Sequence, residues 1–187
     1  MLKLYGGARS RASIVKWYLE ELQLPYEFVL LDMQAGEHRQ PAYLAINPIG
    51  KVPALSDREF HLWESGAILL YLAEKYGEPG LSPERRATLN QWIHYANATL
   101  GLEIFHSSDR DQAVQRHLSA LNELLPAQPF LAGETLSVAD VAVGAVLAYA
   151  QLMLQLDFSA YPAVTHYCQQ LADRPAFQAS IMPKPAA

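Results

Sequence analysis

The stretch that decides the fold is Asn47-Pro48-Ile49-Gly50-Lys51-Val52-Pro53-Ala54-Leu55, a loop marked by proline and glycine that leads into a short apolar segment. A proline at the first position of a strand brings no ladder donor, and a cis bond before it turns the chain sharply. If the Val52-Pro53 bond is cis, the backbone of Val52 faces outward and can pair with an extended peptide as an added strand. The stretch therefore predicts a sheet edge that recognises a peptide main chain.

A second stretch follows within a few residues: Trp63-Glu64-Ser65-Gly66-Ala67-Ile68-Leu69-Leu70-Tyr71-Leu72, typical of a strand end, a polar pair and an apolar helix. Glu64 and Ser65 would stand at the first turn of that helix, where free N–H groups, the hydroxyl and the helix dipole favour a bound carboxylate. Each stretch alone is compatible with an ordinary hairpin and a capping serine. At this spacing, the pair predicts a site for a small peptide with a free acid.

The two stretches, NPIGKVPAL and ESGAILLYLAEKYG, resemble the glutathione-binding half of the soluble glutathione transferases, and the resemblance extends over essentially the whole chain. It implies an α/β thioredoxin-like domain over residues 1–77, a linker over 78–83 and an all-α helical-bundle domain over 84–187. The paired motifs are specific for this fold superfamily. They say much less about the catalytic class or the electrophilic substrate.

The hydrophobic pattern predicts the same order of elements. In the first part we expect strands over 2–5, 26–31, 54–56 and 60–63, helices over 11–22 and 65–76, and a short helical piece over 41–46. After the breakers at 77–80 we expect helices over 84–106, 113–125, 162–172 and 175–181, a buried core helix over 141–156, and a loose tail over 183–187. Ser137 and Asp140 have the spacing of a reciprocal cap at the start of the core helix, which is a folding device.

The composition, with 51% hydrophobic and 18% charged residues, is that of a globular protein. A formal net charge of -5 argues against a nucleic-acid scaffold. The N-terminus lacks the apolar region of a signal peptide, and the segment 141–156 is too short to span a membrane, so we expect a cytoplasmic protein without a membrane partner. The single cysteine, Cys168, excludes an internal disulfide and a CxxC site, and no two of the six histidines stand four apart, so no metal is expected.

A transferase of this kind must lower the pKa of the glutathione thiol, about 8.5 when unperturbed, because the thiolate is the nucleophile. Ser10 is the predicted activating residue, since it lies between a Gly-Gly loop and the first helix, where a hydroxyl and the helix dipole can stabilise the sulfur anion. This position resembles that of the serine in the Ser-type, theta-like bacterial branch. Arg11 is placed beside Ser10 as a second catalytic residue. The alternatives to Ser10 as the activating residue are Ser13, Arg9 and Arg11. The ordinary structural role of Ser10 would be that of an N-cap.

The resemblance also implies which residues hold glutathione, the co-substrate. They are His38 and Lys51 for the glycyl carboxylate, Val52 with Pro53 for the cysteinyl backbone, and Glu64 with Ser65 for the γ-glutamyl end. The alternative interpretation of His38 is an ordinary exposed loop histidine.

The sequence thus predicts a glutathione transferase that conjugates the glutathione thiolate to small hydrophobic electrophiles in detoxification, and by resemblance a homodimer. Glutathione-dependent reduction of organic peroxides at the same site is one alternative. A non-catalytic module of this fold that binds partners or apolar ligands is another. Because no cysteine lies near Ser10, the branches that form a mixed disulfide with glutathione are disfavoured.

Overall fold

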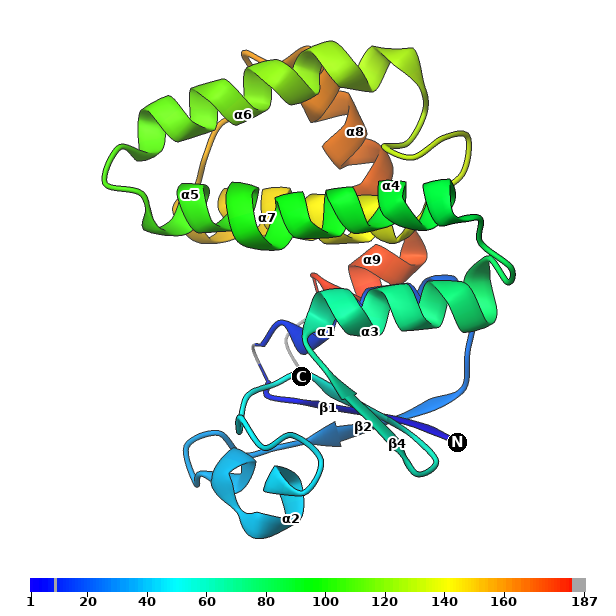
Figure 1. Ribbon diagram of the computed structural model, residues 1–187. Coiled ribbons are helices and arrows are strands. Elements are labelled where there is room, and N and C mark those ends of the chain that lie inside the picture. The colour runs from blue at the N-terminus through cyan, green and yellow to red at the C-terminus, as the bar shows by residue number, and fades with distance from the viewer. Residues whose placement is uncertain (9, 183–187) are drawn as a thin grey trace. The chain divides into compact units, whose positions relative to one another are not determined.

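The computed structural model describes residues 1–8 and 10–182, so the tail expected over 183–187 lies outside the described residues. The described chain forms two compact units, Met1–Gly80 and Leu81–Met182. The first unit is a mixed sheet with helices and the second is helical (Figure 1). The predicted fold class, a thioredoxin-like domain followed by an all-helical domain, is confirmed.

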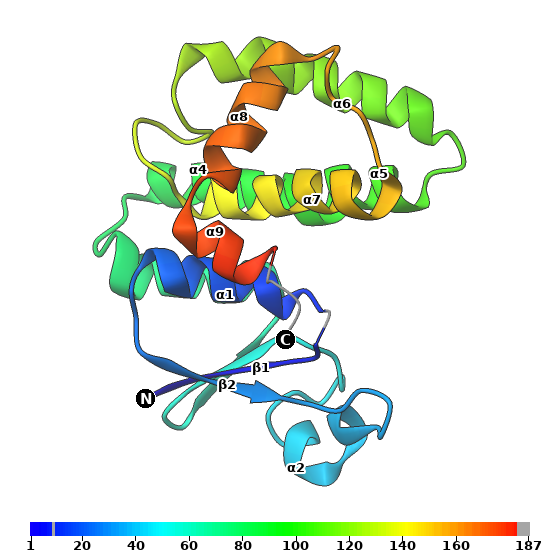
Figure 2. The same ribbon diagram turned by 180° about the vertical axis from the view of Figure 1, so that it is seen from behind.

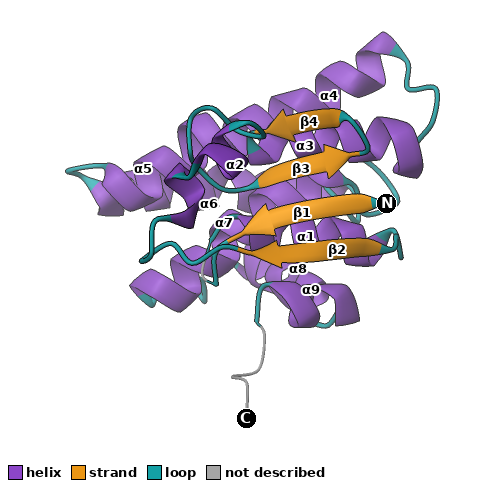
Figure 3. Ribbon diagram, turned by 90° about the horizontal axis from the view of Figure 1, so that it is seen from below, coloured by secondary structure: helices purple, strands orange, loops and turns teal. Residues whose placement is uncertain are grey.

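The first unit is built on a four-stranded sheet in the order β2-β1-β3-β4. Strands β1 and β2 are parallel, and β3 is antiparallel to both β1 and β4. Figure 3 shows α1 and α3 behind one face of this sheet. In chain order the elements are β1 (Leu2–Gly6), α1 (Ala12–Glu21), β2 (Tyr26–Leu30), the 3-10 turn η1 (Glu37–Arg39), α2 (Pro41–Leu44), β3 (Ala54–Asp57), β4 (Phe60–Trp63), α3 (Ser65–Leu72) and the π-helical end η2 (Ala73–Gly77).

The core of this unit lies between the sheet and its two longer helices. Strand β1 alternates buried and half-buried positions, and its Leu4 is paired in register with Leu55 of β3. Both leucines are almost completely buried, as are Trp17 of α1 and Ile68 of α3. Burying such a side chain contributes about 1.5–3 kcal/mol, so the middle of the sheet carries the stability and the strand ends are left for function.

The second unit is organised around its longest helix, α7. Figures 1 and 2 show α7 side by side with α4 in both views. Most of α7 is buried, from Val138 to Ala148, as expected for a core helix. Among the described residues, no helix is both long and apolar enough to cross a membrane. The elements are α4 (Pro83–His94), the π-helical segment η3 (Tyr95–Leu100), α5 (Gly101–His106), α6 (Arg110–Leu124), η4 (Leu125–Ala127), α7 (Val138–Leu154), α8 (Pro162–Ala172) and α9 (Pro175–Ser180).

The reciprocal cap predicted at the start of α7 is confirmed. The Ser137 hydroxyl accepts from the Ala139 N–H at 3.3 Å, and Asp140 accepts from the Ser137 N–H at 2.9 Å. Asp140 also accepts from the Leu131 N–H at 2.8 Å and from the Tyr167 hydroxyl at 3.0 Å. The carboxylate therefore joins α7 to the preceding loop and to α8, beyond its local capping role.

Some boundaries differ from those expected. Helix α6 begins three residues earlier than predicted, because the Asp109 side chain caps it by accepting from the Gln112 N–H at 3.3 Å. The predicted helix over 84–106 is interrupted by the π segment η3, and the one over 65–76 ends in η2. The β3–β4 turn is also tighter than expected, since Asp57 still belongs to β3 and Arg58 takes up a positive φ of 58°.

Candidate functional site

Four loops are brought to one end of the first unit's sheet by the strand directions. Strands β1 and β4 both run antiparallel to β3, and β2 runs parallel to β1. The last residues of β1, β2 and β4 therefore lie at the same end as the first residue of β3. All the predicted site residues that the structure describes follow or precede these strand ends: Ser10 and Arg11 after β1, His38 after β2, Lys51, Val52 and Pro53 before β3, and Glu64 and Ser65 after β4.

The entrance to β3 has the geometry that a peptide-binding edge needs. The Val52-Pro53 bond is cis, and Pro53 is buried. The β1–β3 ladder starts only at Ala54, which is paired with Tyr5. Within the described residues, the N–H and C=O of Val52 make no backbone hydrogen bond. A half-buried Val52 with an unpaired main chain can accept a further strand.

The loop before the cis proline is fixed by two side chains that sequence reasoning did not single out. The Tyr43 hydroxyl donates to the Lys51 carbonyl at 2.6 Å, and the side-chain amide of the buried Asn47 donates to the same oxygen at 2.7 Å. The Asn47 amide oxygen also accepts from the Ile49 N–H at 3.0 Å. The Asn-Pro dipeptide at 47–48 signals a turn, but nothing in the sequence around Tyr43 points to Lys51.

Gly50 joins this loop to the segment that carries His38. Its φ is +65°, and an added Cβ would lie 3.1 Å from the His38 carbonyl oxygen. Glycine is therefore favoured at this position, both for the backbone conformation and for the close approach. Contact with Gly50 brings η1, and with it His38, next to Lys51, as the predicted carboxylate clamp requires.

The two side chains of the predicted clamp differ in their exposure. Lys51 is exposed. His38 is half-buried, and its Nδ1 is a buried atom without a hydrogen-bond partner in the described part of the chain. A buried polar atom left unpaired costs about 1–3 kcal/mol, and in this conformation Lys51 is the member of the pair that is open to a ligand.

Glu64 has the most unusual backbone at this end of the sheet, with φ 71° and ψ 119°. A non-glycine residue held in such a region costs about 1–3 kcal/mol and is typical of functional sites. The Glu64 carbonyl accepts the first helical bond of α3, from the Ile68 N–H at 3.0 Å. The N–H groups of the first turn, including that of the buried Ser65, thus have no partner within the helix.

The Ser10 hydroxyl takes part in a hydrogen-bond network of its own loop. Its Oγ accepts from the Gly7 N–H at 3.1 Å and from the Ala12 N–H at 3.3 Å. It donates its single proton to the Gly7 carbonyl at 3.1 Å. Ser10 therefore holds the loop against the start of α1, and its proton must leave the Gly7 carbonyl before it can reach a sulfur anion.

The alternatives to Ser10 lie in different settings. Ser13 donates its hydroxyl to the Ser10 carbonyl at 2.8 Å, so it takes part in the first turn of the helix. Arg11 is the exposed N-cap residue of α1, with its backbone already in the helical region. Arg9 lies outside the described residues. Of the two alternatives that the structure describes, Arg11 is the one whose side chain is exposed at the helix start.

Two further groups decide what chemistry the chain can supply. Burial raises the pKa of Cys168 to about 12, so this thiol, which belongs to the second unit, stays protonated at neutral pH. Burial likewise raises the pKa of the Tyr43 hydroxyl to about 12, which keeps it a hydrogen-bond donor to Lys51. The protein itself offers no thiolate, so a thiolate reaction at this site needs a thiol from the ligand.

Comparison with known proteins gives an independent result. The family model "Glutathione S-transferase, N-terminal domain" matches residues 1–74, and "Glutathione S-transferase, C-terminal domain" matches residues 83–170. The glutathione S-transferase GstB of Escherichia coli K12 is 36% identical over 205 residues, covering 97% of this chain and 98% of that protein. The disulfide-bond oxidoreductase YfcG of the same organism is 33% identical over 200 residues, covering 94% of this chain and 92% of that protein.

The fold is also similar to solved structures. The glutathione transferase URE2P6 of Phanerochaete chrysosporium, determined in complex with oxidized glutathione, superposes with a TM-score of 0.81 at 29% sequence identity. The match covers 97% of this chain and 94% of that one. The likeness therefore includes both units.

Proposed function

The chain belongs to the glutathione S-transferase family and is a transferase enzyme that uses glutathione, and from that premise we propose that it conjugates the glutathione thiolate to small hydrophobic electrophiles. We further propose that it does so in the cytoplasm, as a homodimer, in detoxification. The observation that carries the proposal is the main chain of Val52, which has no backbone hydrogen bond within the described residues and lies beside the cis Pro53, at the same end of the sheet as the start of α3.

The cysteinyl residue of glutathione would pair with Val52 as a one-residue strand. Main-chain hydrogen bonds of this kind give affinity without regard to the side chain, so the thiol is left free to react. The end of β1 is paired with the start of β3, and the loop after β1 carries Ser10. A thiol held by Val52 would therefore lie near the end of β1, where the loop that carries Ser10 begins.

The glycyl carboxylate would be bound by Lys51 and His38. Lys51 supplies an exposed cation, and His38 supplies a ring whose Nδ1 has no partner in the described chain. The hydrogen bonds of Tyr43 and Asn47 to the Lys51 carbonyl fix the backbone from which this cation extends. A preformed clamp loses less conformational entropy when the ligand binds.

The γ-glutamyl end carries both an ammonium and a carboxylate, and the start of α3 offers a partner for each. The exposed Glu64 can bind the ammonium, while the Ser65 hydroxyl and the N–H groups of the first turn, which have no partner within the helix, can bind the carboxylate. The positive φ at Glu64 costs conformational free energy. Ligand binding would offset this cost, because the same conformation presents the Glu64 carboxylate and the first turn of α3 to one ligand.

Ser10 would stabilise the thiolate by turning its hydroxyl from the Gly7 carbonyl to the sulfur. The two N–H groups that its Oγ accepts can stay in place during this rotation, so the oxygen remains anchored. The N-terminus of α1 adds a favourable dipole, and Arg11 a positive charge. These features favour the Ser-type, theta-like branch.

A second function, glutathione-dependent reduction of disulfides or organic peroxides, is suggested by the relative named disulfide-bond oxidoreductase. It would use the same bound thiolate. Because Cys168 is the sole cysteine and burial raises its pKa to about 12, the electrons would come from glutathione alone, two molecules of which are oxidised to one disulfide. Reduction and conjugation therefore share the binding edge and differ in the second substrate.

Calorimetric titration with glutathione tests the binding edge, and three assays compare the reactions: conjugation of chlorodinitrobenzene, reduction of cumene hydroperoxide and reduction of hydroxyethyl disulfide. Lys51→Ala should weaken glutathione binding. Arg58→Asn is the matched control, since Arg58 is also exposed but lies in the β3–β4 turn, at the other end of the sheet, and asparagine tolerates its positive φ. If glutathione does not bind, or if the two substitutions have equal effects, the assignment of the glutathione site is wrong. If only the disulfide or the peroxide is turned over, the second function replaces conjugation.

A further inference from the structure

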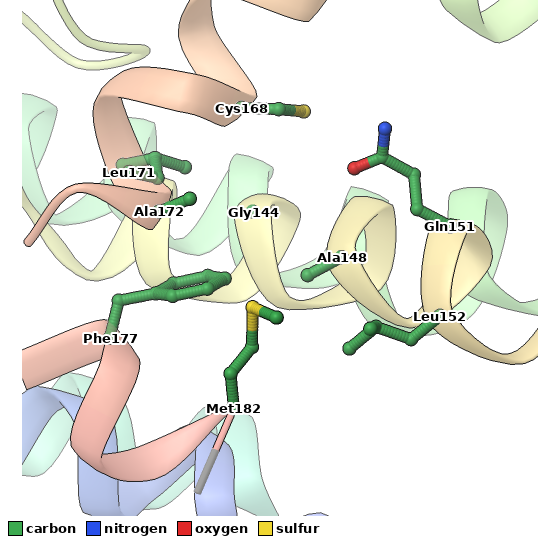
Figure 4. Close-up of a pocket in the computed structure, with 9 residues that line it drawn as sticks. All are labelled: Gly144, Ala148, Gln151, Leu152, Cys168, Leu171, Ala172, Phe177 and Met182. Atoms are coloured by element: carbon green, nitrogen blue, oxygen red, sulfur yellow. The ribbon is translucent and has the colours of Figure 1, made fainter. Parts of the chain in front are cut away.

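A pocket of about 300 Å³ lies within the second unit, between α7, α8 and α9 (Figure 4). Every residue that lines it belongs to this unit, and none of them is part of the candidate glutathione site. The α7 wall is formed by Gly144 and Ala148, and the facing walls include Leu171 of α8 and Phe177 of α9. Small residues on one helix opposite large ones on the others leave a space that the chain does not fill.

The polar groups of the pocket are few and uncharged. Figure 4 shows the Gln151 amide and the Cys168 thiol directed into the space between α7 and α8. Among the lining residues, all within the described part of the chain, none is charged. Burial raises the pKa of the Cys168 thiol to about 12, so this group too is neutral at physiological pH.

Two apolar residues that line the pocket are exposed. Leu152, in the last turn of α7, is 50% exposed, and Met182, at the end of the described chain, is 49% exposed. These two side chains extend the apolar lining of the cavity to the surface. Sites for small molecules occupy about 300–1,000 Å³ and combine apolar walls with a few placed polar groups, as this one does.

We propose that this pocket binds a neutral small molecule with an apolar body and one hydrogen-bonding group, which the Gln151 amide recognises. The amide can donate or accept, so an alcohol, a carbonyl or an amide on the ligand is suitable. An ionised group is not, because the lining offers no opposite charge to offset its loss of water. The proposal does not depend on the conjugation reaction.

Cys168 provides a direct test, because it is the sole cysteine and lines the pocket. Naphthalenemethanol, a neutral bicyclic alcohol, is the probe, and naphthoate is its charged counterpart of similar size. The rate at which N-ethylmaleimide alkylates Cys168 is followed by intact mass. At about ten times its dissociation constant, naphthalenemethanol should slow alkylation about tenfold, whereas naphthoate at the same concentration should leave the rate nearly unchanged.

Variants separate the pocket from the rest of the protein. Ala148→Phe fills the space and should abolish the protection, while Ala120→Phe, on the exposed surface of α6, should retain it. Gln151→Leu should weaken naphthalenemethanol more than naphthalene, because only the alcohol uses the amide. If Ala148→Phe fails to fold, Ala172→Leu narrows the same pocket from α8.

A crystal soaked with bromonaphthalenemethanol gives a second reading that does not rely on the thiol, since the anomalous signal of bromine should lie between α7, α8 and α9. S-methylglutathione, which has no free thiol, should leave the alkylation rate unchanged. The proposal is overturned by an unprotected Cys168 together with bromine elsewhere. It is equally overturned if naphthoate protects as well as the alcohol, or if S-methylglutathione alone gives the same protection.

Discussion

Tyr43 donates its phenolic hydroxyl to the main-chain carbonyl of Lys51 across 2.6 Å, so a residue of α2 fixes the backbone immediately before Val52 and the cis proline. The ring of Tyr43 also packs against Tyr5 of β1, with the ring centroids 5.8 Å apart. A hydrogen bond and an aromatic contact thus connect the loop before the cis proline to strand β1.

The first prediction follows from this connection. Tyr43→Phe and Asn47→Ala should each raise the dissociation constant for glutathione about threefold to tenfold, since one hydrogen bond contributes about 0.5–1.5 kcal/mol. Calorimetry measures the change. Tyr26→Phe is the control: it also removes a hydroxyl bonded at 2.6 Å, in this case to Glu20, but at the far end of the sheet. An equal loss of affinity in that variant would contradict the positioning role.

The second prediction concerns Ser10. Ser10→Ala should lower kcat/KM about 10- to 1,000-fold and raise the pKa of the bound thiol towards about 8.5, because the sulfur loses a hydrogen-bond donor. The pH profile of kcat/KM with chlorodinitrobenzene reports this pKa. Ser13→Ala, which removes a hydroxyl bonded to the Ser10 carbonyl, should leave the profile in place. If the two variants behave alike, loop stability explains the effect and Arg11 becomes the leading candidate.

The third prediction is a pH dependence of stability. The buried Asp57 accepts hydrogen bonds from Tyr71 at 2.8 Å, Tyr76 at 3.0 Å and Lys75, and the bond from Lys75 is the main reason that its pKa is lowered to about 2. A carboxyl group with a lowered folded-state pKa stabilises the protein above its unfolded pKa of about 3.9, and this stability is lost as the pH falls towards 2.

The loss should amount to about 1–2 kcal/mol of unfolding free energy between about pH 4 and pH 2, a value reduced for the solvent around the 44% exposed Lys75. Urea unfolding across this range measures it. Asp57→Asn should be less stable at neutral pH and should show a correspondingly flatter acid limb. A limb as steep as in the parent would mean that other carboxylates are responsible.

The fourth prediction concerns the core of the second unit. Asp140→Ala should lower the unfolding free energy by about 3–5 kcal/mol, because it leaves the buried N–H groups of Leu131 and Ser137 and the Tyr167 hydroxyl without their acceptor. Tyr167→Phe removes only one of these bonds and should cost about 1 kcal/mol. Thermal unfolding compares the two, and similar losses would show that the bonds from the Leu131 and Ser137 N–H groups contribute little beyond the bond from Tyr167.

The local features of the chain could be predicted from its sequence, and the contacts across elements could not. Val52-Pro53, Ser137-Asp140 and the strand pattern are signals within a few residues, and each has the predicted geometry. The bond from Tyr43 to Lys51 depends on how α2 folds back over the loop. The direction of the Ser10 proton depends on the path of the Gly-Gly loop. The pocket beside Cys168 depends on the fit of three helices, which no local pattern encodes.

The last prediction separates strain from charge at Glu64. Glu64→Gly should raise the unfolding free energy by about 1 kcal/mol. Glycine adopts φ 71° without the strain of about 1–3 kcal/mol, but part of this gain is lost because glycine gives the unfolded chain more conformational entropy. It should also weaken glutathione binding, since the carboxylate for the γ-glutamyl ammonium is lost. Glu64→Gln keeps the strain and loses the charge, so it should bind as weakly without the gain in stability. Calorimetry and urea unfolding of both variants separate the two contributions. If Glu64→Gly binds as tightly as the parent, the carboxylate does not touch the ligand, and the strained backbone serves only the turn into α3.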